Sequence, residues 1–282
     1  MQAAVYDERI CELGEGPFWH PERGQLFWFD ILGRRLLTRA ADRTQEWRFD
    51  EHVSAAGWID RDTLLIASET GLYRFGIATG ARSLLHPLEA ENPETRSNDG
   101  RADPFGGFWI GTMGKRAQDG AGAIYRMHEG RIVKLFDAIT IPNSICFAPD
   151  GRTAYFADTP RRQILRQPLD AAGWPTGAPA VFVDLNAEGL NPDGSVVDAE
   201  GALWNAQWGA GRVARYLPDG TLDRVVPVGG RHSSCPAFGG AGLRDLFVTT
   251  AREGLSDPQP GDGVVYSAVQ TIAGLAEHRV SI

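Results

Sequence analysis

Short apolar runs recur along the whole chain, and turns that contain Gly or Asp separate them. In GQLFWFDILGRRLL and in GRTAYFADTPRRQILR, an aromatic-rich run is followed after a turn by a second apolar run. Runs of about four to six residues, alternating or continuously apolar, predict β-strands, whereas helices need apolar residues three and four positions apart. The pattern predicts a chain folded almost entirely into short strands.

This strand-turn-strand unit repeats six times. Each repeat contains an apolar pair, and the second residue of the pair marks its position. The six markers are Trp28, Leu65, Trp109, Phe156, Trp204 and Phe247. Neighbouring markers are 37 to 48 residues apart, and a period of about 40 to 50 residues is typical of a four-stranded propeller blade. The sequence therefore predicts an all-β, six-bladed β-propeller, with residues 1–282 as a single domain around a central channel.

The sixth repeat needs an outer strand from elsewhere in the chain if the ring is to close. Two segments can supply it, residues 3–12 near the N-terminus and residues 274–280 near the C-terminus. Pairing one of them with the last blade would remove an exposed strand edge.

Composition narrows the possible partners. The formal net charge of −8 argues against nucleic acid or an anionic membrane, since both require a basic face. The cysteines Cys11, Cys146 and Cys235 have no close spacing, so neither a disulfide framework nor a thiolate zinc site is indicated. The sequence has no signal-peptide pattern at its start and no long apolar run. We expect a cytoplasmic protein, a monomer or weak homo-oligomer, that binds a small molecule.

Four repeats have a carboxylate or an amide 11 to 13 residues before their marker. They are Glu15, Asn98, Asn143 and Asp193. Because the innermost strand of each blade lines the channel, these side chains are expected to meet at one mouth. Crowded carboxylates there repel each other unless a cation compensates, and oxygen ligands favour Ca²⁺, Mg²⁺, Mn²⁺ or Fe²⁺ over a tight zinc site. An Asp in a PDG turn is often only a turn residue, so the agreement of four repeats carries this prediction.

Two further candidates flank Asn98. Arg96 lies two positions earlier, on the same face of an extended strand, where its guanidinium could hold a substrate oxygen. Asp99 points the other way and is a candidate for orienting its neighbours or capping a turn. Trp58 or Trp208 could wall a sugar pocket, although packing between blades is the simpler interpretation. The sequence lacks HExxH, GxSxG, GxGxxG and P-loop motifs.

Five motifs, in order along nearly the whole chain, resemble the gluconolactonase/regucalcin (senescence marker protein) family. They are ELGEGPFWH, RSNDGRADPFGGFWIGTM, IPNSICFAPDG, NPDGSVVDAEGALWNAQWGAGRV and FGG…LFVTTAREGL. The resemblance implies a six-bladed propeller with one catalytic divalent metal ion. It implies that Glu15, Asn143 and Asp193 are the metal ligands and that Asp193 is also the catalytic base. Calcium is the ion expected first, with Zn²⁺, Mn²⁺, Mg²⁺ and Fe²⁺ as alternatives.

The same resemblance assigns residues to the substrate. Arg96 and Asn98 are similar to the family's substrate-binding pair, and Asp99 belongs to the same motif. After GTM, some animal members have acidic residues that touch substrate, whereas this chain has Gly, Lys and Arg at positions 114–116. We therefore expect Arg116 to contact the substrate. We also expect the positive charge at the pocket rim to alter which substrate is chosen.

The resulting prediction is a metal-dependent lactonase that opens a sugar (aldono-) lactone to its sugar acid. Glucono-, galactono-, xylono- and arabinonolactone are all compatible with the sequence. One alternative is a broader metal-dependent esterase or phosphotriesterase. Another is a non-enzymatic role as a regucalcin-like calcium-binding regulator or a scaffold. Arg96 and Asn98 beside the metal ligands favour an enzyme, because a scaffold would not need them.

Overall fold

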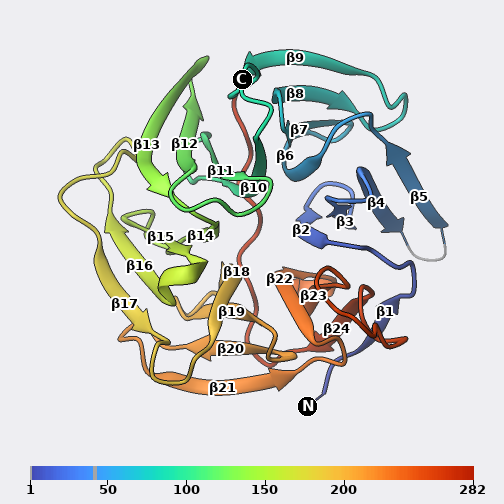
Figure 1. Cartoon of the computed structure of the whole chain (residues 1–282), viewed down its shortest axis with the longest axis vertical. Coiled ribbons are helices and arrows are strands. Elements are labelled where there is room, and N and C mark those ends of the chain that lie inside the picture. The colour runs from blue at the N-terminus through green and yellow to red at the C-terminus, as the bar shows by residue number, and fades with distance from the viewer. Residues whose placement is uncertain (1, 41–42) are drawn as a thin grey trace.

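The computed structural model describes residues 2–40 and 43–282, and almost all of their regular structure is β. In these residues, twenty-four strands form six four-stranded antiparallel sheets. The sheets stand around a central channel like the blades of a propeller (Figure 1). The predicted six-bladed β-propeller is confirmed. No helix of the described chain is long and apolar enough to cross a membrane.

The blades follow one another along the chain, and the first strand of each is the innermost (Figure 1). Blade 1 contains β2 (Gly14–His20), β3 (Gln25–Asp30), β4 (Arg35–Ala40) and β5 (Arg43–Arg48). Blade 2 contains β6 (Val53–Asp60), β7 (Thr63–Ser68), β8 (Gly71–Gly76) and β9 (Arg82–Pro87). Blade 3 contains β10 (Thr95–Ala102), β11 (Phe108–Gly114), β12 (Gly122–His128) and β13 (Arg131–Ile139).

The other three blades have the same build. Blade 4 contains β14 (Pro142–Phe147), β15 (Thr153–Asp158), β16 (Gln163–Pro168) and β17 (Ala180–Asp184). Blade 5 contains β18 (Asn191–Val197), β19 (Leu203–Trp208), β20 (Arg212–Tyr216) and β21 (Leu222–Pro227). Blade 6 contains β22 (His232–Gly239), β23 (Asp245–Ala251) and β24 (Val265–Val269), with β1 (Ala4–Asp7) at its outer edge. Two short 3₁₀ turns, Thr159–Arg161 and Ala241–Leu243, complete the regular structure of the described residues.

The six sequence markers all lie on the second strand of their blade, and all are buried. They fill the space between neighbouring sheets. The Trp204 ring, for example, meets Phe238 of the next blade edge to face, with 5.6 Å between ring centroids. Burying a large apolar side chain at the same point of every repeat, aromatic in five of the six, supplies the apolar area that holds the blades together.

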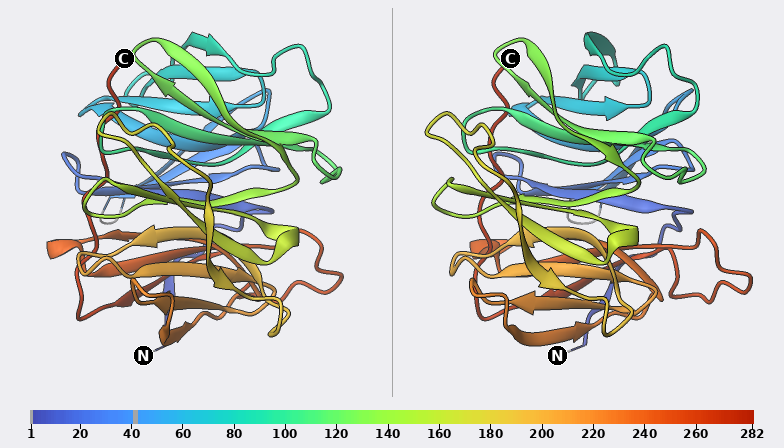
Figure 2. Two further views of the ribbon diagram at one scale, coloured as in Figure 1. Left: turned by 90° about the vertical axis from the view of Figure 1, so that its left-hand side faces the viewer. Right: turned by 60° about the vertical axis from the view of Figure 1, so that its left-hand side comes forward.

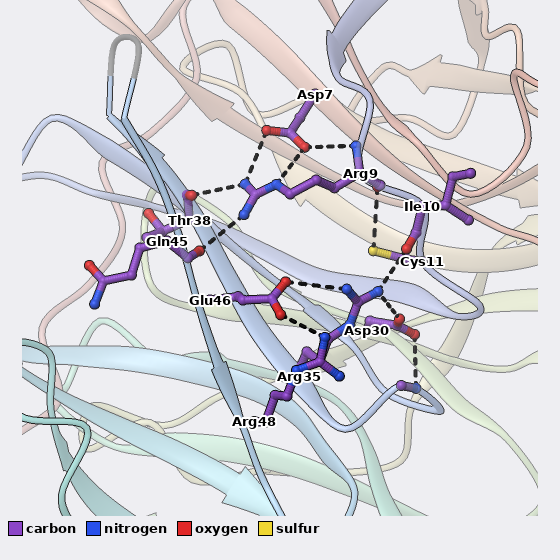
Figure 3. A network of polar contacts seen from close by, with 11 residues as sticks. Asp7, Arg9, Ile10, Cys11, Asp30, Arg35, Thr38, Gln45, Glu46 and Arg48 are labelled. Atoms are coloured by element: carbon purple, nitrogen blue, oxygen red, sulfur yellow. Dashed lines mark hydrogen bonds and ion pairs between the residues drawn. The ribbon is translucent and has the colours of Figure 1, made fainter.

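Strand β1 closes the ring by pairing with β24, with Ala4 opposite Ser267 and Val5 opposite Tyr266. The N-terminal candidate for the outer strand is therefore confirmed. Hydrogen bonds from arginine side chains hold the segment between β1 and blade 1 in place (Figure 3). Arg9 binds the Asp7 carboxylate at 2.9 Å and donates to the Thr38 carbonyl oxygen, also at 2.9 Å. These contacts tie the closing strand to both blades that it joins.

The other candidate, residues 274–280, is not a blade strand but part of a C-terminal segment, residues 273–281, that crosses the channel. Its backbone is held by Gly274 N–H on the Leu243 carbonyl and by Val280 N–H on the Trp58 carbonyl, both at 2.8 Å. Glu277 pairs with Arg101 of β10. Figure 2 shows this segment along one face of the ring, while the loop that follows β23 projects from the opposite face. The C-terminal segment therefore covers one end of the channel.

Each innermost strand changes register against its neighbour near the other end of the channel. The shifts lie between Glu15 and Phe18, Val53 and Ala55, Ser97 and Gly100, Asn143 and Cys146, Pro192 and Ser195, and Ser233 and Pro236. An extra residue of this kind is a β-bulge, which bends the strand and re-aims its side chains. All four polar residues singled out in the repeats border or lie within these bulges.

Candidate functional site

A cavity of about 410 Å³ lies at the channel end where the innermost strands begin. Its lining includes six of the seven residues that the sequence predicts to bind the metal ion or the substrate. They are Glu15, Arg96, Asn98, Arg116, Asn143 and Asp193. These residues come from blades 1, 3, 4 and 5, so the fold brings together side chains that are far apart in the sequence.

Two of the bulges have left-handed backbone directly after a ligand candidate. Gly16 follows Glu15 with a φ of 52°, and Ser144 follows Asn143 with a φ of 61°. A Cβ atom at Gly16 would also lie 2.3 Å from the Ser54 carbonyl oxygen, so only glycine fits there. Non-glycine residues in this region are uncommon and concentrate at functional sites.

Ser144 itself links two blades. Its buried hydroxyl donates to the Asp193 carbonyl oxygen at 2.5 Å and accepts from the Ser195 hydroxyl at 3.0 Å. The bulge of blade 4 is therefore locked to the bulge of blade 5, which fixes the backbone that presents Asn143 and Asp193 to the cavity.

Two carboxylates share the cavity floor with no ion-pair partner among the described residues. Glu15 and Asp193 are only 5% and 4% exposed. Burial, together with the negative charge of Asp99, raises the pKa of Glu15 to about 8, although the Gly16 N–H and the Arg96 charge act in the opposite direction. Burial and the Glu15 charge raise the pKa of Asp193 well above its usual range. Both groups therefore resist ionisation unless a cation joins them.

A chain of hydrogen bonds orients the amides beside these carboxylates. Arg96 Nη1 donates to Asn98 Oδ1 at 2.8 Å, and Asn98 Nδ2 donates to Asn143 Oδ1 at 3.0 Å. Asn143 Nδ2 donates to Thr159 Oγ1 at 2.8 Å, and that hydroxyl donates to the Pro192 carbonyl oxygen at 2.7 Å. The chain runs from blade 3 to blade 5 and determines which atom of each amide is an acceptor.

Asp99, the seventh nominated residue, does not line the cavity. Its carboxylate is buried and accepts a hydrogen bond from the Ile145 backbone N–H at 2.7 Å. Burial raises its pKa to about 6, and the nearby Arg101 charge opposes this rise. Asp99 therefore lies beneath the cavity floor, where its negative charge acts on Glu15. Because its side chain does not line the cavity, the structure gives no surface of Asp99 for the substrate contact expected from the sequence.

The two basic residues at the rim differ in their surroundings. The Lys115 side chain is 32% exposed, and its Nζ lies 3.2 Å from Glu69 Oε2. The same oxygen is 2.5 Å from His52 Nδ1, so blade 2 holds this lysine against the cavity wall. Arg116 is 74% exposed and pairs at 2.8 Å with Glu94, which is itself exposed. Lys115 is therefore fixed at the cavity, whereas Arg116 is directed toward solvent.

Sequence reasoning missed part of the wall. Glu253 lines the cavity from the loop that follows β23, and Trp208 lines it from the end of β19. The floor residues lie on the innermost strand of each repeat, whereas Glu253 lies outside that strand. A search for polar residues directly after the second strand of each repeat would have found it. For Trp208, the sequence favours packing between blades over a pocket wall, whereas the structure places it at the cavity.

The residues on the floor fit a divalent cation. Glu15 and Asp193 supply carboxylate oxygens and Asn143 supplies an amide oxygen, the donor types that hard cations prefer. No cluster of three His, Cys, Asp or Glu side chains suited to a metal ion occurs in residues 2–40 and 43–282, so the candidate set depends on the amide. Two buried carboxylates without a cationic partner are stable as anions only when positive charge is added.

Comparison with known proteins gives consistent matches. Residues 13–252 match the model of the SMP-30/gluconolactonase/LRE-like region. The L-arabinolactonase of Azospirillum brasilense is 36% identical over 99% of this chain and 95% of its own length. The 6-deoxy-6-sulfogluconolactonase of Pseudomonas putida is 32% identical over 94% of both chains. The crystal structure of a calcium-binding protein, regucalcin, from Agrobacterium tumefaciens has a TM-score of 0.97 and 43% identity, covering 100% of this chain and 98% of that one.

Proposed function

Because the chain belongs to the SMP-30/gluconolactonase/LRE-like family, we propose that it is a metal-dependent hydrolase of sugar lactones. Lactone hydrolysis is supported by relatives named L-arabinolactonase and 6-deoxy-6-sulfogluconolactonase, which match over nearly their full length. Metal dependence is supported by one observation above all. Glu15 and Asp193 lie buried at the cavity floor without an ion-pair partner among the described residues, beside the oriented amide of Asn143.

Glu15, Asn143 and Asp193 would hold the ion, with Ca²⁺ expected first, in line with the regucalcin neighbour, and Zn²⁺, Mn²⁺, Mg²⁺ or Fe²⁺ as alternatives. A divalent ion bound there supplies Lewis acidity, which polarises the lactone carbonyl and stabilises the negative charge that develops on its oxygen.

Asp193 is the proposed base. Its carboxylate accepts a proton from the water whose oxygen bonds to the lactone carbonyl carbon. When the bond between that carbon and the ring oxygen breaks, Asp193 returns the proton to the ring oxygen, which becomes a hydroxyl. The product is the open sugar acid, and Asp193 is regenerated.

Arg96 and Asn98 are the proposed positioning pair for the lactone. Arg96 Nη1 is engaged by the Ser97 carbonyl and by Asn98 Oδ1. No described residue accepts a hydrogen bond from its Nε or Nη2, so these donors are available for substrate oxygens. Holding the carbonyl carbon near Asp193 converts an encounter in solution into a reaction within the cavity.

The test is a panel of glucono-, galactono-, xylono- and arabinonolactone, assayed with metal-stripped and metal-reloaded protein and corrected for spontaneous opening. We expect hydrolysis of at least one aldonolactone that is lost with the metal and restored by reloading. Glu15→Gln should lower metal retention while the protein stays folded. Full activity in the stripped protein would overturn the metal dependence, and an inert reloaded protein would overturn the lactonase. Simple esters and phosphotriesters in the same panel test the broader esterase alternative.

A further inference from the structure

One wall of the cavity is built from blades 5 and 6 and is separate from the floor. Trp208 and Glu253 line this wall, and His232 supports both of them from behind. The Trp208 and His232 rings are stacked, with centroids 4.2 Å apart and planes 25° from parallel. Trp208 also packs against the apolar cluster that contains Leu13 and Ala251. The half-buried indole is therefore held in one orientation beside the cavity.

His232 also fixes the loop that carries Glu253. Its Nδ1 lies 3.0 Å from the Glu253 backbone carbonyl oxygen, and since a carbonyl only accepts, Nδ1 carries the proton. Burial lowers the pKa of His232, which favours the neutral ring. A neutral imidazole between the two residues joins the aromatic ring and the acidic residue into one preformed unit.

The polar atoms of this wall lack partners in the protein. The structure gives the Glu253 carboxylate no hydrogen bond or ion pair with any residue that it describes, and Trp208 Nε1 has no acceptor among them. Arg96 influences Glu253 by charge without forming a direct ion pair. A half-buried carboxylate on a cavity wall is costly when it is unpaired, so such a group is expected to accept hydrogen bonds from a ligand.

A sugar ring has the chemical groups that match Trp208 and Glu253. It has an apolar face of C–H groups, which packs on an indole, and an edge of hydroxyls, which donate to a carboxylate. A carboxylate oxygen accepts without donating, and hydrogen bonds to a charged group are stronger than neutral ones. An apolar ester offers the carboxylate no donor and would leave it desolvated and unpaired.

We propose that Trp208 and Glu253 form the subsite that holds the sugar ring, with the ring packed on the indole and its hydroxyls donating to the Glu253 carboxylate. This subsite rests on the proposed lactonase function and narrows it. Glu253 favours polyhydroxylated lactones over unsubstituted ones by binding their hydroxyls, while the floor residues carry out the reaction.

The test compares Glu253→Gln and Trp208→Leu with the wild type, all loaded with metal. Glu12→Gln is the matched control, because Glu12 is an exposed carboxylate near Glu253 and does not line the cavity. Two readouts are needed. One is kcat and KM for a polyhydroxylated 1,5-lactone and for δ-valerolactone, which has the same ring without hydroxyls. The other is the calorimetric affinity for a polyhydroxylated 1,5-lactam, a ring that the enzyme does not open.

Glu253→Gln should weaken lactam binding and lower kcat/KM for the hydroxylated lactone by about 10- to 100-fold, mainly through KM. It should change kcat/KM for δ-valerolactone by less than about threefold. Trp208→Leu should also raise KM for the hydroxylated lactone and weaken the lactam, and Glu12→Gln should resemble the wild type. Equal losses on both lactones, a loss in kcat at unchanged lactam affinity, or an equal loss in Glu12→Gln would overturn the subsite. If no lactone is hydrolysed by the wild type, the proposed function fails, and the lactam affinities still test the subsite.

Discussion

Without the proposed divalent ion, we expect the stability of this protein to fall as the pH rises from 5 to 8. Burial raises the pKa of Glu15 from its usual 4.5 to about 8, and Asp193 moves in the same direction. The folded protein therefore binds the Glu15 proton more tightly than the unfolded chain does. The resulting stabilisation is complete below pH 4.5 and is lost as the pH rises through 8.

The size of the effect follows from the two pKa values of Glu15. Each tenfold difference in proton affinity corresponds to about 1.4 kcal/mol, so the change from 4.5 to about 8 implies a loss of about 4 kcal/mol between pH 5 and pH 8. For a chain of 282 residues, 1 kcal/mol shifts the melting temperature by about 2 °C. We expect Tm to fall by about 5 to 10 °C over this range from Glu15 alone.

The assay is thermal unfolding between pH 5 and pH 8, in a chelator and in saturating Ca²⁺. The proposed ion would compensate the buried negative charge, so we expect the decline to disappear in the loaded protein. Glu15→Gln is the matched variant, since it keeps the shape of the protonated side chain and cannot ionise, and its metal-free decline should be smaller. A metal-free Tm that is flat over this range, or a slope unchanged in Glu15→Gln, would refute the reasoning.

Two further predictions concern activity. Asp193→Asn keeps an oxygen for the ion but cannot accept a proton, so at saturating metal the hydrolysis rate should fall about 10²- to 10⁴-fold. Near-normal turnover with verified metal occupancy would leave Asp193 a ligand only. Lys115→Gln should change the ranking of lactones in the aldonolactone panel, because Glu69 holds Lys115 at the cavity, whereas Arg116→Gln should change it little because that side chain is exposed. A larger change of the lactone ranking in Arg116→Gln than in Lys115→Gln would contradict this assignment.

The fold could be predicted because every blade needs the same feature at the same place. The second strand of each blade must bury a large apolar pair against its neighbour, and Trp28, Trp109 and Trp204 are completely buried. This requirement is local in each repeat and therefore visible as a period. The C-terminal segment was less predictable, since residues 274–280 could equally pair with a blade edge or cross the channel. Its course depends on partners such as Trp58 and Leu243 that are distant in sequence.

The floor of the site could be predicted for a similar reason, and its wall could not. Glu15, Asn143 and Asp193 occur at nearly the same point of repeated strands, so their convergence follows from the propeller itself. Glu253 lies in the connection that follows β23, outside the innermost strands that carry the floor residues. A tryptophan such as Trp208 has the same sequence signature whether it packs between blades or faces a cavity, and only its tertiary neighbours distinguish the two.

The contact of blade 6 with blade 1 completes the ring around the site. On the ribosome, Glu15 emerges long before Asp193 and Glu253, and the residues of β24 follow all three. Blade 6 is held beside blade 1 by direct contacts, such as the Glu253 N–H on the Glu12 carbonyl oxygen, and by the pairing of β1 with β24, so the distance between Glu15 and Glu253 is set only when blade 6 has folded against blade 1. We therefore expect a newly made chain to lack the complete cavity until blade 6 has folded against blade 1.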